Sequence, residues 1–202
     1  MATIYDLKPR FQALLRPIAA RLVNAGATAN GVTLAALIMS LAQGGAIAFW
    51  PESRWPLLLL PVTLFVRMAL NAIDGIMAKE HDQKSNIGAL FNEISDVVSD
   101  AALYLPFALI AGVNAPLVVL VVVASVIAEM AGVLGPMIGA TRRYDGPFGK
   151  SDRAFGFGAL AVLLGLGLSP GLWTTSVLAV MLVLAAVTVW NRARRAVAEA
   201  AT

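Results

Sequence analysis

Six long apolar segments dominate this sequence, and they restrict its possible folds more than any other feature. Each is close to the roughly 20 residues that a helix needs to cross a hydrocarbon layer about 30 Å thick. They run near 32–50, 56–78, 88–112, 116–140, 154–168 and 172–190. The fifth is the shortest and is rich in glycine. The sequence therefore predicts an all-α, polytopic membrane protein with six transmembrane helices.

The composition agrees with this class and excludes several others. Hydrophobic residues make up 59% of the 202 positions and charged residues only 13%, against about 45–50% and about 25% in soluble domains. Because the chain has no cysteine, disulfide scaffolds, thiolate metal sites and cysteine nucleophiles are excluded. The length suits one domain. We therefore expect a single membrane domain over residues 1–202, with a juxtamembrane segment at 1–27 and six helices within 32–190.

Lysine and arginine lie almost entirely on one side of the predicted spans. Thirteen of them fall in the N-terminal segment, in the loops after the second and fourth spans, and after the last span. The other side has only Arg54, and Arg67 lies inside a span. The positive-inside rule then places both termini and the two polar loops in the cytoplasm. Because topology accounts for the net charge of +3, no nucleic-acid partner is expected.

The first 24 residues place apolar side chains at helical spacing with basic residues between them. The apolar positions include Phe11, Leu14, Leu15, Ile18 and Leu22. This pattern predicts an N-terminal amphipathic helix that lies on the membrane surface. The segment lacks the apolar core of a signal peptide, so we expect no cleavage. The polar side chains within 28–30 are suited to cap the first span.

Polar residues inside two adjacent spans form the candidate site. The second span contains Arg67, Asn71, Asp74 and Ala78 at intervals of four, three and four residues. The third contains Gly88, Asn92, Asp96 and Asp100 at intervals of four, with Glu93 beside them. Such spacing gathers each set on one face of its helix. Ionisable groups within a membrane cost at least about 2.5–3.5 kcal/mol each, so they indicate functional positions.

A short loop near 80–87 joins these two spans, so their helices should be antiparallel neighbours. Asp74 and Asp96 then lie at similar depth, because a helix rises about 1.5 Å per residue. Two carboxylates and two carboxamides make an all-oxygen site suited to a hard divalent cation such as Mg²⁺. The same residues also fit a structural hydrogen-bonded network or the lining of a water-filled ion path.

The full pattern reads Asn71-x2-Asp74-Gly75-x2-Ala78-Lys79-x8-Gly88-x3-Asn92-x3-Asp96. It resembles D-x2-D-G-x2-A-R-x8-G-x3-D-x3-D, the signature of the CDP-alcohol phosphotransferases (also called CDP-alcohol phosphatidyltransferases), with every interval preserved. Five of the eight defined positions are identical: Asp74, Gly75, Ala78, Gly88 and Asp96. A match of this length is far more specific than a short glycine motif.

This resemblance implies an integral membrane enzyme, commonly a homodimer. Such an enzyme moves a substituted phosphate from a CDP-alcohol, such as CDP-diacylglycerol, to an acceptor hydroxyl during phospholipid biosynthesis and releases CMP. By the resemblance, Mg²⁺ or Mn²⁺ is held by Asn71, Asp74, Asn92 and Asp96. The CDP group is contacted by Asp74, Gly75, Ala78, Lys79 and Gly88. Asp96, at the last acidic position, matches the general base of the family.

Three positions depart from the signature. Asn71 and Asn92 stand where the family has Asp, which removes two formal negative charges from the metal site. Hard cations bind more weakly as ligand charge falls. Lys79 replaces Arg and loses bidentate recognition of phosphate. A single ion, or a contribution from Glu93 or Asp100, is therefore an alternative to a two-ion site.

Basic residues near the same cytoplasmic mouth are candidates for binding an anionic acceptor or a lipid phosphate. They are Arg67, Arg142, Arg143, Lys150 and Arg153. The topology alone also predicts basic residues in the loop at 141–153, and Arg67 alternatively forms a buried ion pair with Glu129 of the fourth span. Two other functions stay open for the chain. One is a catalytically degenerate scaffold that binds lipid or nucleotide, and the other is a small transporter.

Overall fold

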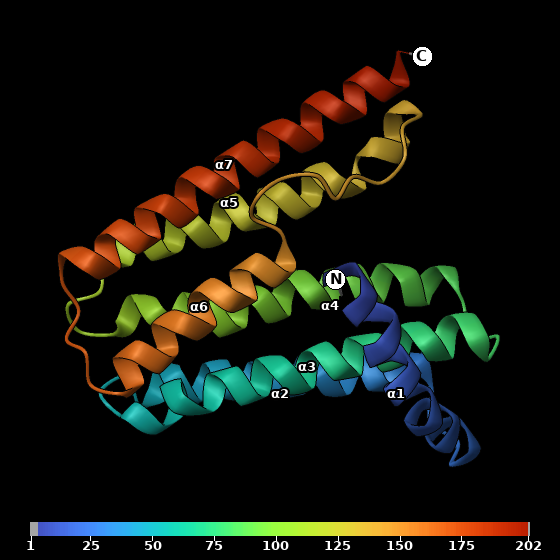
Figure 1. Cartoon of the computed structure of the whole chain (residues 1–202), viewed down its shortest axis with the longest axis horizontal. Helices are drawn as coiled ribbons and strands as arrows, with labels where there is room; N and C mark the ends of the chain where they lie inside the picture. Colours follow the sequence, from blue (N-terminus) through green and yellow to red (C-terminus); the bar gives the residue numbers. More distant parts are fainter. Residues whose placement is uncertain (1–3, 202) are drawn as a thin grey trace. The chain divides into compact units, whose positions relative to one another are not determined.

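The computed structural model describes residues 4–201, and every regular element in that range is helical (Figure 1). In chain order the elements are α1 (Ile4–Asn24), α2 (Ala29–Phe49), α3 (Arg54–Glu80), α4 (Asn86–Tyr104), the 3₁₀ turn η1 (Leu105–Leu109), α5 (Ala115–Val133), the 3₁₀ turn η2 (Gly135–Ile138), α6 (Lys150–Gly165) and α7 (Leu172–Ala200). The all-α prediction is confirmed.

Each of the six predicted spans overlaps one of the helices α2 to α7. Among the described residues, α2, α3, α5 and α7 are long and apolar enough to cross a membrane. The other two fall short for different reasons: α4 carries three acidic residues within 19 positions, and α6 has only 16 residues. The structure thus supports a membrane protein, whereas the number of six spans stays a prediction.

Two helices end earlier than the sequence predicted, in each case at a proline. The sequence predicted one continuous helix over the third span, 88–112. In the structure α4 stops at Tyr104, and the turn η1 with Pro106 follows. The fourth is shortened in the same way, because α5 stops at Val133 before the turn η2 with Pro136. Proline cannot donate a backbone hydrogen bond to the preceding turn, and its ring clashes there. Regular α-helix therefore gives way to a short 3₁₀ turn.

The described chain divides into two compact units. The first unit comprises residues 4–42 and 62–99, and the second comprises residues 43–61 and 100–201. The first unit thus holds α1, most of α2, the C-terminal part of α3 and most of α4. All of the signature positions from Asn71 to Asp96 belong to this unit.

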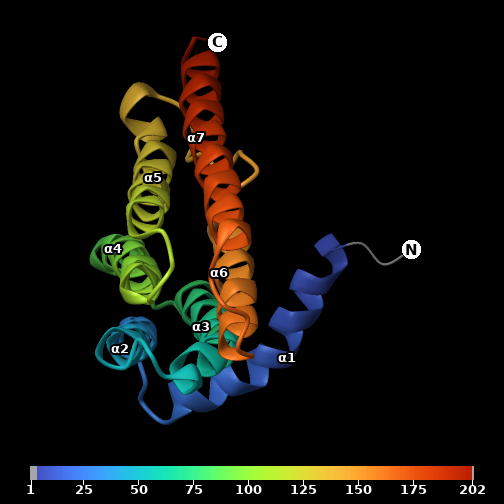
Figure 2. The ribbon, with the colours of Figure 1, turned by 90° about the vertical axis from the view of Figure 1, so that its left-hand side faces the viewer.

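Helix α1 packs one of its sides against the core of the first unit. Leu15 and Ala19 are buried there together with apolar residues of α2 and α3, and the ring of Phe11 meets Phe65 edge to face at 6.1 Å. The next side of the helix is exposed, with Leu14 at 73%. Figure 2 shows α1 crossing α3 rather than running alongside it. Its position on a membrane surface stays a prediction.

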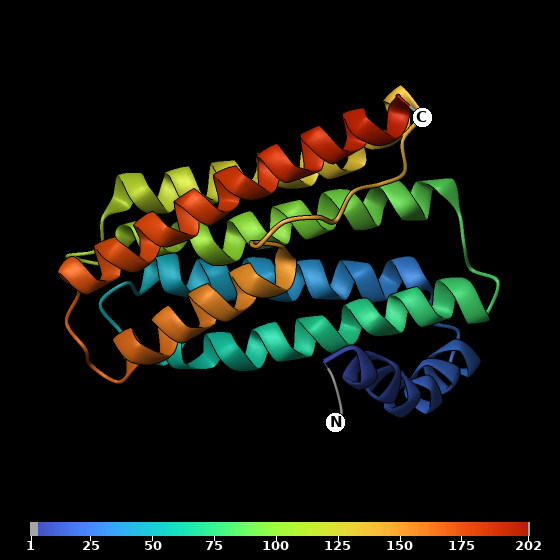
Figure 3. The same cartoon turned by 45° about the horizontal axis from the view of Figure 1, so that its top comes forward.

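In the second unit, α5 and α7 run side by side (Figures 1 and 3). A close approach also joins the end of α2 to the end of α4. A Cβ atom on Gly44 would lie 1.9 Å from the backbone oxygen of Ala102. No side chain fits in that space, so glycine is required for the two helices to approach this closely.

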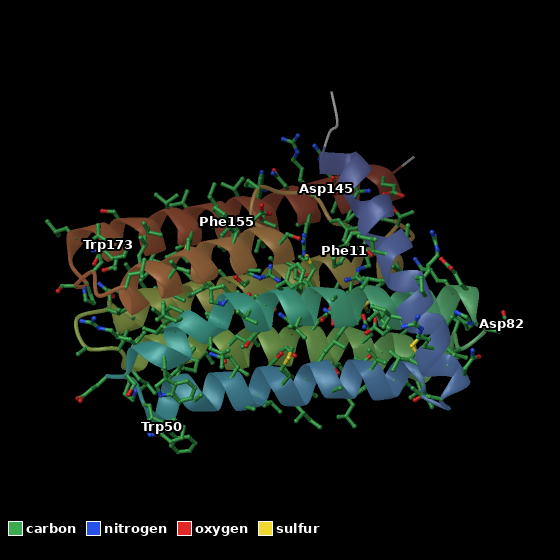
Figure 4. The ribbon with its side chains drawn as sticks, turned by 60° about the horizontal axis from the view of Figure 1, so that its bottom comes forward. Phe11, Trp50, Asp82, Asp145, Phe155 and Trp173 are labelled. Carbon is green, nitrogen blue, oxygen red and sulfur yellow. The ribbon has the colours of Figure 1, made fainter. Side chains whose placement is uncertain are left out.

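Large apolar side chains stay exposed along the candidate membrane helices. Phe65 of α3 is 58% exposed, and Val180 and Val183 of α7 are 57% and 61% exposed. Trp50 and Trp173 lie beside the end of α2 and the start of α7 (Figure 4). Apolar helix faces with tryptophan at their ends are typical of proteins that contact lipid.

Candidate active site

The candidate site is built by α3 and α4 within the first unit. Only residues 81–85 connect the two helices, which therefore run in opposite directions (Figure 3). Asp82 in this loop has a positive φ of 54°, a conformation that Asp tolerates better than most residues. The predicted antiparallel pairing is confirmed. As a result, the two polar stripes of the sequence meet along the helix pair.

Two carboxamides and two carboxylates pair across these helices. Asn71 Nδ2 on α3 donates to Asp96 Oδ1 on α4 at 3.1 Å. Asn92 Nδ2 on α4 donates to Asp74 Oδ2 on α3 at 3.2 Å. Each helix therefore offers one carboxamide and one carboxylate to the other. The structure brings together the four residues that the resemblance assigns to the metal.

Arg67 adds a cation to this group from one turn further along α3. Its Nη2 atom donates to the backbone oxygen of Asp96 at 3.0 Å and lies 3.4 Å from Asp96 Oδ1. The Arg67 residue is only 3% exposed. A buried guanidinium needs a nearby anion, and Asp96 supplies it.

Thr33 of α2 is a site residue that sequence reasoning missed. Its hydroxyl lies 2.8 Å from Asp74 Oδ2 and 3.1 Å from the backbone oxygen of Ala29. The shorter contact is a hydrogen bond from the hydroxyl to the Asp74 carboxylate. The only sequence signal is a polar residue one turn after Asn30 in an otherwise apolar segment.

The small residues of the signature differ in their surroundings. A Cβ atom on Gly75 would meet nothing within 4 Å, whereas one on Gly88 would lie 2.8 Å from Asn30 Oδ1. Gly88 therefore allows α4 to approach the start of α2, and Gly75 leaves open space beside Asp74. Ala78 is half-buried and Lys79 is exposed at the end of α3.

The donor set fits one hard divalent cation. Carboxylate and carboxamide oxygens are the ligand types that Mg²⁺ and Mn²⁺ prefer, and Mg²⁺ commonly uses one or two carboxylates. Asp74 and Asp96 supply that number. Among the described residues, no cluster of three or more His, Cys, Asp or Glu side chains is suited to a metal ion. Glu93 is half-buried next to Asn92, and its auxiliary role stays a prediction.

Other predicted site residues lie in the second unit, where they form a buried network of ion pairs. Arg153 of α6 donates to Asp100 of α4 and to Glu129 of α5. Glu129 also accepts from Arg192 of α7 at 3.2 Å. The alternative pairing of Arg67 with Glu129 is therefore wrong, because Glu129 is bound by these two arginines and Arg67 lies against Asp96.

The arginines of the basic loop at 141–153 make two kinds of contact, ion pairs with carboxylates and a cation–π contact with an aromatic ring. Arg143 donates to Asp145 at 2.8 Å and also to Glu199 near the end of α7, whereas the Arg142 guanidinium lies 4.7 Å from the centre of the Tyr144 ring. Asp145 (Figure 4) also forms an ion pair with Arg195. Much of the positive charge near this loop is thus paired with carboxylates.

The ion pairs of this loop affect the acidity of Asp145. Burial by itself would raise the pKa of Asp145. Hydrogen bonds from Arg143 and Arg195 outweigh that effect and hold the pKa below its usual value. Correspondingly, the hydrogen bond to Asp145 is the main cause that raises the pKa of Arg143. The carboxylate therefore keeps its charge into the acid range.

The two glycines of this loop have structural surroundings that explain them. Gly146 has a φ of 125°, and a Cβ atom there would lie 2.6 Å from the Thr188 methyl group. The N–H of Gly149 donates to Asp152 at the start of α6. Lys150 is half-buried in the first turn of that helix. Neither glycine needs a phosphate to explain its place, so the binding of an anion by this loop stays a prediction.

Comparison with curated proteins identifies two relatives. The chain is 48% identical over 164 residues to the inner membrane protein YnbA of Escherichia coli strain K12. This match covers 80% of this chain and 81% of that protein. It is 34% identical over 99 residues to a phosphatidylinositol phosphate synthase of Streptomyces avermitilis. The second match covers 49% of this chain and 39% of the relative. No protein-family model matches the chain.

Solved structures with a similar fold include two of the Mycobacterium tuberculosis phosphatidylinositol phosphate synthase. The structure in complex with manganese and citrate has a TM-score of 0.76, 18% identity, and coverage of 90% of this chain and 88% of that chain. The structure with CDP-DAG bound has a TM-score of 0.73, 19% identity and 94% coverage of both chains. These likenesses concern the arrangement of the helices.

Proposed function

We propose that the chain belongs to the CDP-alcohol phosphatidyltransferase family and transfers a phosphatidyl group from a CDP-alcohol such as CDP-diacylglycerol to an acceptor hydroxyl. The sequence signature, the match to a phosphatidylinositol phosphate synthase and the similar helix arrangement support this family. CMP is the second product. The reaction belongs to phospholipid biosynthesis. The relative with CDP-DAG bound and the phosphatidylinositol phosphate synthase from Streptomyces avermitilis support this class of donor.

The observation that carries the proposal is the pairing of the two signature carboxylates with carboxamides across α3 and α4. Asp74 and Asp96 come from opposite helices, yet each is hydrogen-bonded to a signature residue of the other helix. A structural network would need these polar groups to be satisfied, but it would not need the open space beside Gly75. Carboxylates next to room for a ligand favour a site over a purely structural contact.

In the proposed reaction, the acceptor hydroxyl attacks the phosphorus atom that carries the lipid alcohol. The bond from this phosphorus to the oxygen shared with CMP breaks, and CMP leaves with that electron pair. Asp96 takes the proton of the acceptor hydroxyl as the general base. Its hydrogen bonds from Asn71 and Arg67 fix the direction of the carboxylate, which a positioned base requires.

The remaining signature residues bind the donor and the metal ion. Mg²⁺ or Mn²⁺, held by Asn71, Asp74, Asn92 and Asp96, would neutralise charge that develops on the phosphoryl oxygens and on CMP. Asp74, Gly75, Ala78, Lys79 and Gly88 form the proposed contacts to CDP. Lys79, at the exposed end of α3, offers a mobile point charge to a phosphate.

The proposed acceptor residues are supported unequally. Arg67 donates to the backbone oxygen of the proposed base at 3.0 Å, and this proximity supports a role toward an acceptor or a phosphate. Arg142, Arg143, Lys150 and Arg153 remain candidates from the sequence. Among them, Arg143 and Arg153 already bind carboxylates, so an anionic acceptor would have to compete with these ion pairs.

We place the protein in the membrane as one domain with six spans, α2 to α7, and with both termini and the site in the cytoplasm. The distribution of basic residues supports this orientation. The N-terminal segment 1–27 then lies along the membrane surface. A homodimer is the proposed assembly, which a molar-mass measurement on the detergent-purified protein tests.

The first experiment measures CMP release from CDP-diacylglycerol by purified protein, with and without Mg²⁺ or Mn²⁺, against pooled hydroxyl acceptors. Metal-dependent release of CMP is expected, and dividing the pool identifies the acceptor. Asp96→Asn should abolish release while the protein still folds. Equal activity in this variant would exclude Asp96 as the base. Nucleotide binding without CMP release indicates a degenerate scaffold, and substrate flux in liposomes without CMP indicates a transporter.

A further inference from the structure

The hydrogen bonds of the site fix which way the two signature carboxamides point. A carboxylate has no hydrogen to donate, so an asparagine that contacts it must present its N–H₂ group. Asn71 does this toward Asp96 at 3.1 Å, and Asn92 does it toward Asp74 at 3.2 Å. In this arrangement neither amide oxygen takes part in its pair, although a cation would require that oxygen as a ligand.

From this geometry we propose that the site binds one divalent cation rather than two, and that Asn71 and Asn92 act as rotating ligands. Without metal, their amide N–H groups bond the carboxylates. With metal, each amide turns about its terminal bond and offers its oxygen. The inference depends on the proposed function only for the position of the metal site.

Charge decides the number of ions. The family signature has acidic residues at all four ligand positions, and four carboxylates balance two divalent cations. This chain keeps Asp74 and Asp96, whose two negative charges balance a single divalent cation. Arg67, 3% exposed and 3.4 Å from Asp96, adds a fixed positive charge at the same place. A second cation would therefore be held in a partly buried site against a net positive charge, which is unfavourable.

The same hydrogen bonds predict a site that stays formed without metal. Four carboxylates close together repel one another until cations bind. Here each amide donates to one oxygen of a carboxylate, and the Thr33 hydroxyl donates a further hydrogen bond to Asp74 Oδ2 at 2.8 Å. Removing metal should therefore lower the melting temperature less than it would in a site with four carboxylates. Asp at positions 71 and 92 would remove both amide donors and restore the repulsion.

The test is Mn²⁺ binding to the purified full chain, with free Mn²⁺ measured by electron paramagnetic resonance. The wild type should bind one Mn²⁺ per chain, and the double variant Asn71→Asp with Asn92→Asp should bind two. Asn114→Asp is the matched control. Asn114 accepts a hydrogen bond from the N–H of Leu117 at the start of α5, a contact that Asp keeps, and this variant should still bind one ion.

A second measurement covers the case in which the double variant folds poorly. Chelation with EDTA should lower the melting temperature of the wild type only by the stabilisation that one bound ion adds, and should lower that of the single variant Asn92→Asp by more. Adding Mn²⁺ should restore both. Two Mn²⁺ ions bound by the wild type, or none, would overturn the inference. One bound ion without CMP release would contradict the proposed reaction while leaving the single-ion site intact.

Discussion

Arg153 reaches the carboxylate of Asp100 through two nitrogens at once, with Nε at 3.0 Å and Nη2 at 2.8 Å from the same oxygen. Nη2 also lies 2.8 Å from Glu129, which accepts from Arg192 as well. Arg153 is 2% exposed. Within the second unit, the end of α4 and the helices α5, α6 and α7 are thus joined through charges that water does not reach easily.

Removing Arg153 should destabilise the protein strongly. Arg153→Ala leaves Asp100 without this guanidinium in a buried position, and breaking a buried ion pair in this way costs about 3–5 kcal/mol. For a chain of this size, the melting temperature should fall on the order of 10 °C. Thermal unfolding in detergent measures the change.

Arg16→Ala is the control for Arg153→Ala. Arg16 pairs with Glu80 at 3.0 Å, but the side chains are 52% and 41% exposed. An exposed pair contributes about 0–1 kcal/mol, so this variant should melt close to the wild type. A similar fall in melting temperature in both variants would show that burial does not determine how much the Arg153 network stabilises the protein.

Thr33 should act as a positioning residue for Asp74. Thr33→Val keeps the shape of the side chain but removes the hydroxyl that lies 2.8 Å from Asp74 Oδ2. Loss of a hydrogen bond that orients a metal ligand typically costs 10–100-fold in metal affinity or activity. We expect Mn²⁺ affinity and CMP release to fall within that range, and Thr33→Ser to recover most of both.

Ser125→Ala provides the comparison for Thr33→Val. Ser125 is a buried hydroxyl residue that bonds only the backbone of its own helix in the described contacts, through Val121 at 2.7 Å. Its removal should leave Mn²⁺ binding unchanged. If Thr33→Val binds Mn²⁺ as tightly as the wild type, Thr33 does not position Asp74 for metal binding and its role is only structural.

The pH dependence of stability should show the contribution of Asp145. Its pKa is lowered in the folded protein because the hydrogen bonds from Arg143 and Arg195 outweigh the effect of burial. A carboxylate with a lowered pKa stabilises the fold fully above its unfolded pKa and loses this effect as the pH falls through the folded pKa. Asp145→Asn should therefore melt a few degrees below the wild type at pH 7.

The difference between the wild type and Asp145→Asn should persist down to about pH 4, the ordinary range of Asp, and shrink only below it. Melting curves of both proteins from pH 3 to pH 7 measure it. Arg195→Ala leaves the Arg143 bond in place and should show an intermediate loss. A difference that disappears between pH 5 and pH 6 would contradict the assignment to Asp145.

The sequence was sufficient to predict the helix pair that carries the site. The spacing of Asn71 and Asp74 on one helix, and of Asn92 and Asp96 on the next, already implied two facing stripes because the loop between them is short. The structure confirms that antiparallel pair. Local periodicity and a short connection determine such a contact, so it needs no information from distant parts of the chain.

Contacts between distant segments were not predictable in the same way. Thr33 lies 41 residues before Asp74, and Arg153 lies 53 residues after Asp100. Periodicity within one helix indicates which face is polar but not which distant residue covers that face. For this reason the alternative pairing of Glu129 with Arg67 was wrong. The early end of α4 at Tyr104, by contrast, had a local signal, which is Pro106. The apolar composition of the segment made one continuous span the simpler prediction.

Gly75 offers the sharpest separation of binding from stability. A Cβ atom on this residue would meet nothing within 4 Å, and alanine is favoured over glycine inside a helix by about 0.8–1.0 kcal/mol. Gly75→Ala should therefore fold at least as stably as the wild type. If CDP occupies that space, the added methyl group clashes with it, at a cost of about 1–3 kcal/mol.

That cost corresponds to a loss of about 5- to 150-fold in affinity for CMP or CDP-diacylglycerol, which isothermal titration and the KM of CMP release both report. Gly45→Ala in α2 is the matched helical control, since its Cβ would meet only Phe49, at 4.0 Å. Both variants should gain helix stability, but only Gly75→Ala should lose nucleotide binding. Unchanged binding in Gly75→Ala would place the nucleotide elsewhere, because a methyl group in an occupied space cannot be neutral.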